Sequence, residues 1–154
     1  CPQNSSGNDR GKGLKRILGL DIGRVRIGVA ISDPLGTFAQ GIDVLEAGKD
    51  WMEQVRGLVQ ERNIGMIVVG VPVRTDGSKG PEAAWVEAVM EKLRKKEGYG
   101  GVEIVAWDER FSTAEAERTL IKGDLSRRRR KGVIDKVAAT LILQSYLDNR
   151  RISS

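Results

Sequence analysis

The chain has 154 residues, of which 40% are hydrophobic and 31% charged, and its formal net charge is +5. This length fits one domain with a sizeable core, and no apolar run approaches the roughly 18 residues of a membrane-spanning helix. There is no histidine and a single cysteine, Cys1. Histidine-based triads, histidine metal ligands and intramolecular disulfides are therefore excluded, so hydrolysis would depend on carboxylates, lysines or an oxygen-ligated metal.

Residues 1–13 are polar and rich in glycine, serine and asparagine, without periodicity. They predict a disordered tail in front of a single domain over residues 14–150. Because the first residue is not methionine, we expect a fragment or a processed chain. The expected location is the cytoplasm, and an organelle after removal of a targeting peptide is the alternative.

The first half of the domain predicts an antiparallel meander. The apolar runs Ile17–Leu20 and Arg26–Ser32 flank a short turn at Gly23, which is typical of a β-hairpin. After a turn rich in proline and glycine, a third strand is expected over Gln40–Leu45.

Two further elements follow the meander. Asp50 and Glu53 form a capping-box pattern that predicts a helix with Trp51 on its core face. The continuous apolar run Met66–Gly70 is typical of a parallel strand that is covered on both faces. The Asp-Gly signal ending at Gly77 predicts a loop after it.

The second half predicts alternating helices and strands. Pro81 opens a helix that Gly98 stops, a strand spans Val102–Trp107, and Ser112 with Glu115 caps a helix that runs to about residue 121. A last helix over Ile134–Leu147 should place one stripe on the core, formed by Ile134, Ala138, Leu141 and Ser145. The expected fold is α/β: a five-stranded mixed sheet, three antiparallel strands and then α/β units, flanked by helices.

The positive charge is concentrated in one segment, Arg127 to Lys131, with the sequence RRRRK. Without these five, the 26 basic residues become 21, equal to the 21 acidic residues. We expect this segment to be a loop that contacts a phosphate backbone. Because aromatic residues are few, recognition should depend on shape and backbone more than on base sequence. Further candidate nucleic-acid contacts are Arg24, Arg26, Arg110 and Lys122.

Carboxylates occur at the ends of the predicted strands and at the start of the last helix. Asp21 ends the first strand, Asp108 and Glu109 end the last, and Asp135 opens the final helix. If the first and last strands are parallel, these groups meet at one edge of the sheet. Alternation along a strand sends Asp108 and Glu109 to opposite faces, and Glu109 is favoured for its longer reach. Caps at Asp21 and Asp135, and ion pairs with Arg110, are the structural alternatives.

Three carboxylates that lie close together need a raised pKa or a divalent cation. Oxygen ligands favour Mg²⁺ or Mn²⁺, and a pair of such ions about 3.5–4 Å apart can hydrolyse a phosphodiester without histidine. The predicted ligands are Asp21, Glu109 and Asp135.

Four segments, LDIGRVRIGVAISDP, IVVGVPVRTDGS, WDERFSTAEAE and KGVIDKVAATLILQSYL, resemble in order and spacing the YqgF/RuvX family. Its members are Holliday-junction-resolvase-like proteins described as nucleases of the 16S rRNA precursor, and the resemblance covers residues 14 to 147. It implies an RNase H-like fold, a metal-dependent nuclease, and a catalytic set of Asp21, Glu109 or Asp108, and Asp135. Related RuvC-type resolvases carry a second aspartate one turn after the last one, where this chain has Ala138.

The resemblance leaves several readings open. The substrate is structured nucleic acid, either the 5′ end of precursor 16S rRNA or a branched DNA junction, and the protein is a monomer or a homodimer, without membrane association. A different class is an RNA-binding ribosome-assembly factor that has lost catalysis. The Asp21-x-Gly23 motif also resembles the phosphate-binding turn of actin-like sugar kinases, which need a second domain that this length does not accommodate.

Overall fold

The structure, a computed structural model, describes residues 15–112 and 127–153, and in the last helix it describes side chains from Lys136 to Arg150. The predicted tail at residues 1–13 and the helix predicted to follow Ser112 lie outside these ranges. Lys122 and the side chains of Arg127–Lys131 and Asp135 lie outside them as well.

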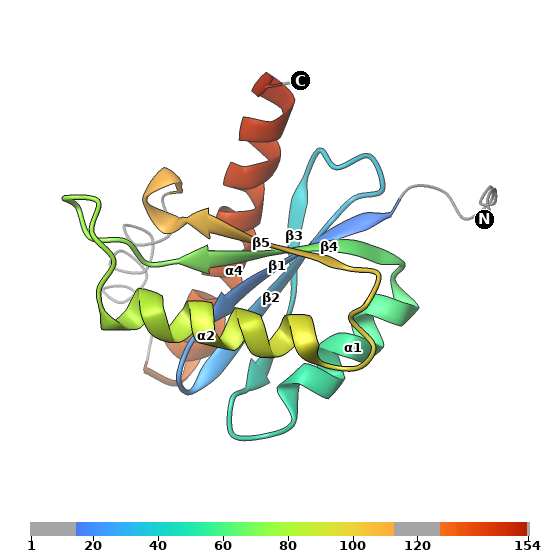
Figure 1. Ribbon diagram of the computed structural model, residues 1–154, viewed down its shortest axis with the longest axis horizontal. Coiled ribbons are helices and arrows are strands. Elements are labelled where there is room, and N and C mark those ends of the chain that lie inside the picture. Colours follow the sequence, from blue (N-terminus) through green and yellow to red (C-terminus); the bar gives the residue numbers. More distant parts are fainter. Residues whose placement is uncertain (1–14, 113–126, 154) are drawn as a thin grey trace.

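The centre of the molecule is a five-stranded mixed sheet in the order β3-β2-β1-β4-β5 (Figure 1). Strand β1 pairs antiparallel with β2 and parallel with β4, and β4 pairs parallel with β5. The predicted meander, the mixed sheet and the shared direction of the first and last strands are confirmed. The strands are β1 (Arg16–Ile22), β2 (Arg26–Ser32), β3 (Ala39–Glu46), β4 (Ile64–Val71) and β5 (Glu103–Asp108).

Helices cover both faces of the sheet (Figure 1). Helices α1 (Trp51–Glu61) and α2 (Pro81–Lys95) lie on one face, and α4 (Arg127–Ser153) crosses the other. A short 3-10 turn, η1 (Glu109–Phe111), follows β5 directly. Within the described ranges, no helix combines the length and apolar character needed to cross a membrane.

The core under α1 and α2 follows from the alternation of the strands. Leu18 and Leu20 of β1 point into it, together with Ile67 and Val69 of β4, and all four are fully buried. Trp51, which was expected in the core, is 8% exposed at the start of α1. The capping box predicted there is wrong, because the side chain of Asp50 makes no capping hydrogen bond.

Glu53, the other half of that expected box, forms ion pairs instead. Its carboxylate accepts a hydrogen bond from Arg56 at 2.8 Å and lies 3.3 Å from the ammonium of Lys96. Two cations therefore compete successfully with the backbone N–H at the start of α1, and they hold the pKa of Glu53 below its ordinary value.

The core under α4 is made of small and branched residues. Ile17, Ala30 and Val68 of the sheet pack against a helix stripe formed by Ala138, Ala139, Ile142, Leu143 and Leu147. Ala138 of the predicted stripe does face the sheet, and the side chain of Ile134 lies outside the described residues. The later half of the stripe was wrong, because Leu141 and Ser145 are only half-buried on the flank of the helix. The pattern of apolar residues did not predict that Ile142, Leu143 and Leu147 continue the buried stripe after the alanines.

The approach of α4 to the sheet depends on glycine. A Cβ atom added at Gly19 of β1 would lie 2.7 Å from Cβ of Leu143 and 3.3 Å from the carbonyl oxygen of Ala139. On β3, an added Cβ at Gly41 would meet the side chains of Lys136 and Thr140. The helix backbone thus rests almost directly on two strands.

The basic segment Arg127–Lys131 was predicted as a loop, and this prediction was wrong. Helix α4 begins at Arg127, so the five basic residues occupy its first turns. Arginine and lysine are good helix formers, and a helix tolerates an isolated glycine such as Gly132. A run of like charges indicates exposure to solvent and does not by itself exclude a helix.

We expect Gly19→Ala to lower the free energy of unfolding by about 1–3 kcal/mol, because the added methyl group overpacks the contact between β1 and α4. Gly57→Ala is the matched control. It lies within α1 with no atom within 4 Å of an added Cβ, so it should stabilise the fold by about 0.5–1 kcal/mol. Urea unfolding measures both changes, and equal effects would contradict the proposed contact.

Candidate active site

Asp21 is a carboxylate built into the middle strand of the sheet. It pairs with Gly28 of β2 and is 8% exposed, although it carries a charge at neutral pH in its ordinary state. Because Ile17 and Gly19 of the same strand contact α4, alternation directs Asp21 to that face as well. A carboxylate is kept in such a position only with compensating partners, which makes it a candidate for chemistry.

Ser32 is the other buried polar residue among the side chains that the structure describes. Its hydroxyl accepts a hydrogen bond from the backbone N–H of Ile17 at 2.9 Å and donates to the carbonyl of Asp33. These two bonds explain its burial as a link between β1 and β2.

Glu109 approaches the same edge from β5. Gly70 of β4 follows Val69, which pairs with Leu20, so Gly70 stands beside Asp21 in the sheet. A Cβ atom added at Gly70 would lie 3.2 Å from Cγ of Glu109 and 2.5 Å from Cδ1 of Ile142. The stem of Glu109 therefore lies over Gly70, on the face covered by α4 and next to the strand that carries Asp21.

Asp108 makes a different set of contacts from Glu109. Its carboxylate accepts hydrogen bonds from the guanidinium of Arg110 at 2.8 and 3.1 Å and from the backbone N–H of Arg110 at 2.9 Å. Arg110 also donates to the carbonyl of Thr75 at 3.4 Å. These hydrogen bonds and the adjacent positive charge keep the pKa of Asp108 below its ordinary value. The pair links the end of β5 to the loop after β4.

The backbone of α4 brings position 135 towards Asp21. Ala139 lies over Gly19, and position 135 is one helical turn earlier on the same side of the helix. Leu147 shares a buried cluster with Ile17 near the start of β1, whereas Ala139 and Leu143, which come earlier in α4, meet Gly19 further along the strand. Continuing by one turn leads to the end of β1 where Asp21 stands.

Among the side chains that are described, no three acidic groups gather closely enough to hold a metal ion. Two of the expected ligands, Asp21 and Glu109, are within that set, and the third, Asp135, is outside it. The structure therefore provides two of three acidic positions with side chains and the third as a helix position.

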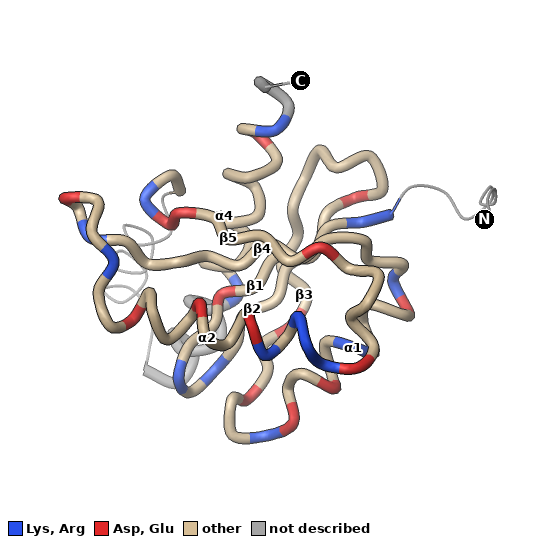
Figure 2. The backbone as a smooth tube through the Cα atoms, in the orientation of Figure 1, with Lys and Arg blue, Asp and Glu red and all other residues tan. Residues whose placement is uncertain are grey.

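Arg24, a predicted nucleic-acid contact, forms an ion pair at the start of α2. Its guanidinium donates to one carboxylate oxygen of Glu82 at 3.0 and 3.1 Å and lies 4.4 Å from the ring centre of Trp85. Basic positions mark the turn between β1 and β2 in Figure 2, where Arg24 and Arg26 lie. Sequence reasoning did not predict the roles of Glu82 and Trp85, and Trp85 is half-buried at the border of the core.

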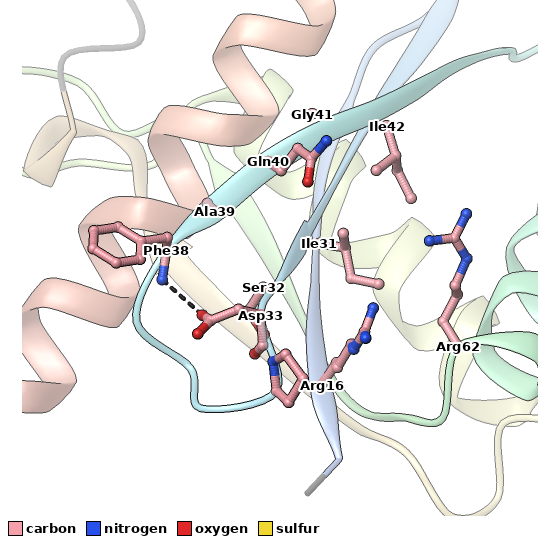
Figure 3. Close-up of a pocket in the computed structure, with 11 residues that line it drawn as sticks. Arg16, Ile31, Ser32, Asp33, Phe38, Ala39, Gln40, Gly41, Ile42 and Arg62 are labelled. Atoms are coloured by element: carbon pink, nitrogen blue, oxygen red, sulfur yellow. Dashed lines mark hydrogen bonds between the residues drawn. The ribbon is translucent and has the colours of Figure 1, made fainter.

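A separate pocket of about 520 Å³ lies at the other end of β1 (Figure 3). Arg16 and Arg62 form one side of it, and Phe38 forms another. Asp33 at its floor accepts the backbone N–H groups of Thr37 and Phe38 at 2.7 and 2.8 Å, and these bonds lower its pKa. This pocket is remote from Asp21 and contributes nothing to the carboxylate edge.

Comparison with known proteins identifies the family. A sequence model of the RuvX family, described as Holliday junction resolvase, matches residues 15–149. The chain belongs to this family. A protein of Thermoanaerobacter pseudethanolicus named "Putative pre-16S rRNA nuclease" is 47% identical over 139 residues, which cover 88% of this chain and 98% of that protein. A protein of the same name from Geobacillus kaustophilus is 45% identical over 140 residues, 88% of this chain and 99% of its own.

Solved structures agree on the fold of this RuvX chain. RuvC of Thermus thermophilus in complex with a Holliday junction substrate superposes with a TM-score of 0.54, covering 91% of this chain and 97% of RuvC, at 11% identity. A second solved structure, described as that of Thermus thermophilus RuvC, superposes with a TM-score of 0.52. The family, the RNase H-like fold and the nuclease class expected from the sequence are confirmed. The relatives described above are bacterial and give no support to an organelle.

We expect Arg110→Gln to raise the pKa of Asp108 towards the ordinary value, because the guanidinium that stabilises the carboxylate is lost. The lowered pKa means that the pair stabilises the fold above the unfolded-state pKa of about 3.9 and ceases to do so as the pH falls through the lower value. A carboxyl NMR titration measures the shift. Asp33 is the internal control, because its pKa is lowered by backbone N–H groups that this substitution leaves in place.

Proposed function

We propose that this RuvX protein is a cytoplasmic, metal-dependent endonuclease that processes the 5′ end of precursor 16S rRNA. The observation that carries the proposal is the buried Asp21 on the face covered by α4, with Glu109 arriving beside it over Gly70. The names of the RuvX relatives support the choice of precursor rRNA. An acidic pair at the shared edge of β1 and β5 suits phosphodiester hydrolysis without histidine.

The residues present suit Mg²⁺ or Mn²⁺. Asp21 and Glu109 offer only carboxylate oxygens, which are the donors that these hard cations prefer. We propose Asp21, Glu109 and Asp135 as the ligands, with Asp108 excluded by its engagement with Arg110. When bound, such a cation lowers the pKa of a water molecule and stabilises the leaving oxygen of a phosphodiester.

The chain's own groups would position the substrate around this edge. The stem of Glu109 lies over Gly70, which directs its carboxylate to this edge of the sheet. Arg24 stands at the neighbouring turn with its guanidinium fixed by Glu82 and Trp85. A preorganised cation beside the acidic edge can hold a backbone phosphate while the adjacent bond is cut.

The basic segment Arg127–Lys131 supports nucleic acid as the partner. It forms the first turns of the helix that leads to Asp135, so a phosphate backbone bound there would pass close to the proposed catalytic carboxylates. Helical placement of these residues spreads them around the helix axis. We therefore propose contacts to more than one backbone segment of a structured RNA.

A second candidate function is the resolution of branched DNA. The family description, Holliday junction resolvase, favours it directly. A symmetric junction would require a dimer, whereas an RNA end would not, so the oligomeric state in the presence of each substrate separates the two.

A third function, of another class, is an RNA-binding assembly factor without catalysis. It shares the basic segment and the fold with the nuclease, and it predicts salt-sensitive binding but no metal-dependent cleavage of any substrate. The feature that favours this function is Ala138, because related resolvases carry a further aspartate at that position.

We expect Asp21→Asn, Glu109→Gln and Asp135→Asn each to reduce cleavage by at least about 100-fold, because loss of metal-dependent stabilisation costs several kcal/mol. The assay compares a precursor 16S rRNA fragment with a four-way DNA junction, in Mg²⁺, in Mn²⁺ and with a chelator. Substrate binding should persist in all three variants.

Two control variants accompany this assay. Asp43→Asn removes an exposed carboxylate of the edge strand β3 and should leave cleavage unchanged. Asp108→Asn distinguishes the two adjacent acids, since cleavage should survive it but not Glu109→Gln. Cleavage by Asp135→Asn at the rate of the unmodified protein would remove Asp135 from the proposed site.

Replacing Arg127, Arg128, Arg129 and Arg130 by glutamine should weaken RNA binding at low salt and flatten its salt dependence. Each lost phosphate contact is expected to lower the slope of log K against log salt by about 0.7–0.9. Arg56→Gln and Arg94→Gln, which remove arginines already engaged with Glu53 and Glu91, form the control pair. An unchanged slope would separate the basic segment from nucleic-acid binding.

A further inference from the structure

An aromatic groove of about 470 Å³ opens beside the candidate active site, between η1 and the outer flank of α4. Phe111 forms its wall and is 64% exposed, which is unusual for so large an apolar side chain. Trp107, at the end of β5, forms its inner side. The remaining lining residues are Ser112, Leu141, Gln144, Ser145, Asp148 and Asn149.

The aromatic wall is held in place by specific contacts. The rings of Trp107 and Phe111 lie 5.3 Å apart at 61°, and Tyr146 contacts the other side of Trp107 at 5.4 Å and 89°. The indole N–H donates to the hydroxyl of Ser145 at 3.0 Å, and that hydroxyl donates to the carbonyl of Phe111 at 2.9 Å. Because its N–H is already used, Trp107 presents ring carbons to the groove and no polar group.

The residues that form the groove flank Glu109 along the chain. Trp107 and Phe111 stand two residues before and two residues after Glu109, on the short stretch that leaves β5. The stem of Glu109 lies near Ile142, and the helix residues that line the groove begin at Leu141. A strand that places a phosphodiester at Glu109 therefore has its neighbouring nucleotide within reach of the groove.

We propose that this groove binds an unpaired nucleobase next to the cleaved phosphodiester, by stacking against Phe111 and Trp107. The inference rests on the proposed nuclease function and names the part of the substrate that the site takes. Base stacking on aromatic rings tolerates any base. The amide of Gln144 is occupied, since it accepts from Ala39 N–H at 2.8 Å and donates to the Thr37 carbonyl at 3.0 Å. Stacking on these rings therefore selects an unpaired base and does not by itself read the identity of that base.

The test compares Phe111→Ala with Phe38→Ala. Phe38 is as exposed, at 69%, but it lines the remote pocket at the other end of β1 (Figure 3). Binding of a single-stranded RNA oligonucleotide is measured with chelator present, so that no cleavage is needed. Phe111→Ala should weaken binding about ten-fold, and Phe38→Ala should change it less than two-fold.

A second measurement moves a single abasic nucleotide along the oligonucleotide. With the unmodified protein, one abasic position should weaken binding about ten-fold, and Phe111→Ala should show no further loss at that position. If Phe111→Ala binds every oligonucleotide as tightly as Phe38→Ala does, the inference is overturned. It is also overturned if Phe111→Ala changes only self-association in sedimentation experiments, because the groove would then be an interface between copies.

These outcomes are distinct from failure of the nuclease. If no substrate is cut under any metal condition while the abasic effect depends on Phe111, the stacking groove stands and the proposed catalysis falls. If cleavage is metal-dependent while the abasic effect does not depend on Phe111, the proposed catalysis is supported and the stacking groove is overturned.

Discussion

The architecture depends on the close approach of α4 to the sheet. Glycines on β1 and β3 make it possible, since an added Cβ at Gly19 or Gly41 would collide with the helix. The small residues Ala138 and Ala139 complete the contact from the helix side. A backbone that rests directly on β1 carries position 135 towards Asp21, so the steric contact between helix and strand determines whether the proposed acidic site exists.

Ion pairs fix several of the charged side chains around that contact. Asp108 and Arg110 satisfy each other beside the loop after β4, and Arg24 is fixed by Glu82 and Trp85 at the hairpin turn. Glu109, one residue from Asp108, leaves β5 on the other face and lies over Gly70. One dipeptide thus supplies a structural ion pair on one face and a candidate metal ligand on the other, which is a direct consequence of strand alternation.

The edge of the sheet also joins two kinds of recognition. The carboxylates suit a cation and a phosphodiester, whereas the aromatic groove of Trp107 and Phe111 suits an apolar, planar group. Both draw on the short stretch from Trp107 to Phe111 and on successive turns of α4. A RuvX protein of this design could thus combine backbone cleavage with a requirement for an unpaired base, which fits structured RNA with single-stranded ends.

The sequence by itself determined the order of strands and helices, the mixed sheet and the family, because hydrophobic periodicity and turn residues act locally and the four motifs lie in a fixed order. It misjudged the buried stripe of α4 and the helical state of Arg127–Lys131, since side-chain composition does not tell a solvated helix from a loop. Only the tertiary structure placed Glu109 over Gly70, joined Arg24 to Trp85 and opened the groove at Phe111. Those outcomes depend on which residues, distant in sequence, are packed together, and local pattern carries no information about such contacts.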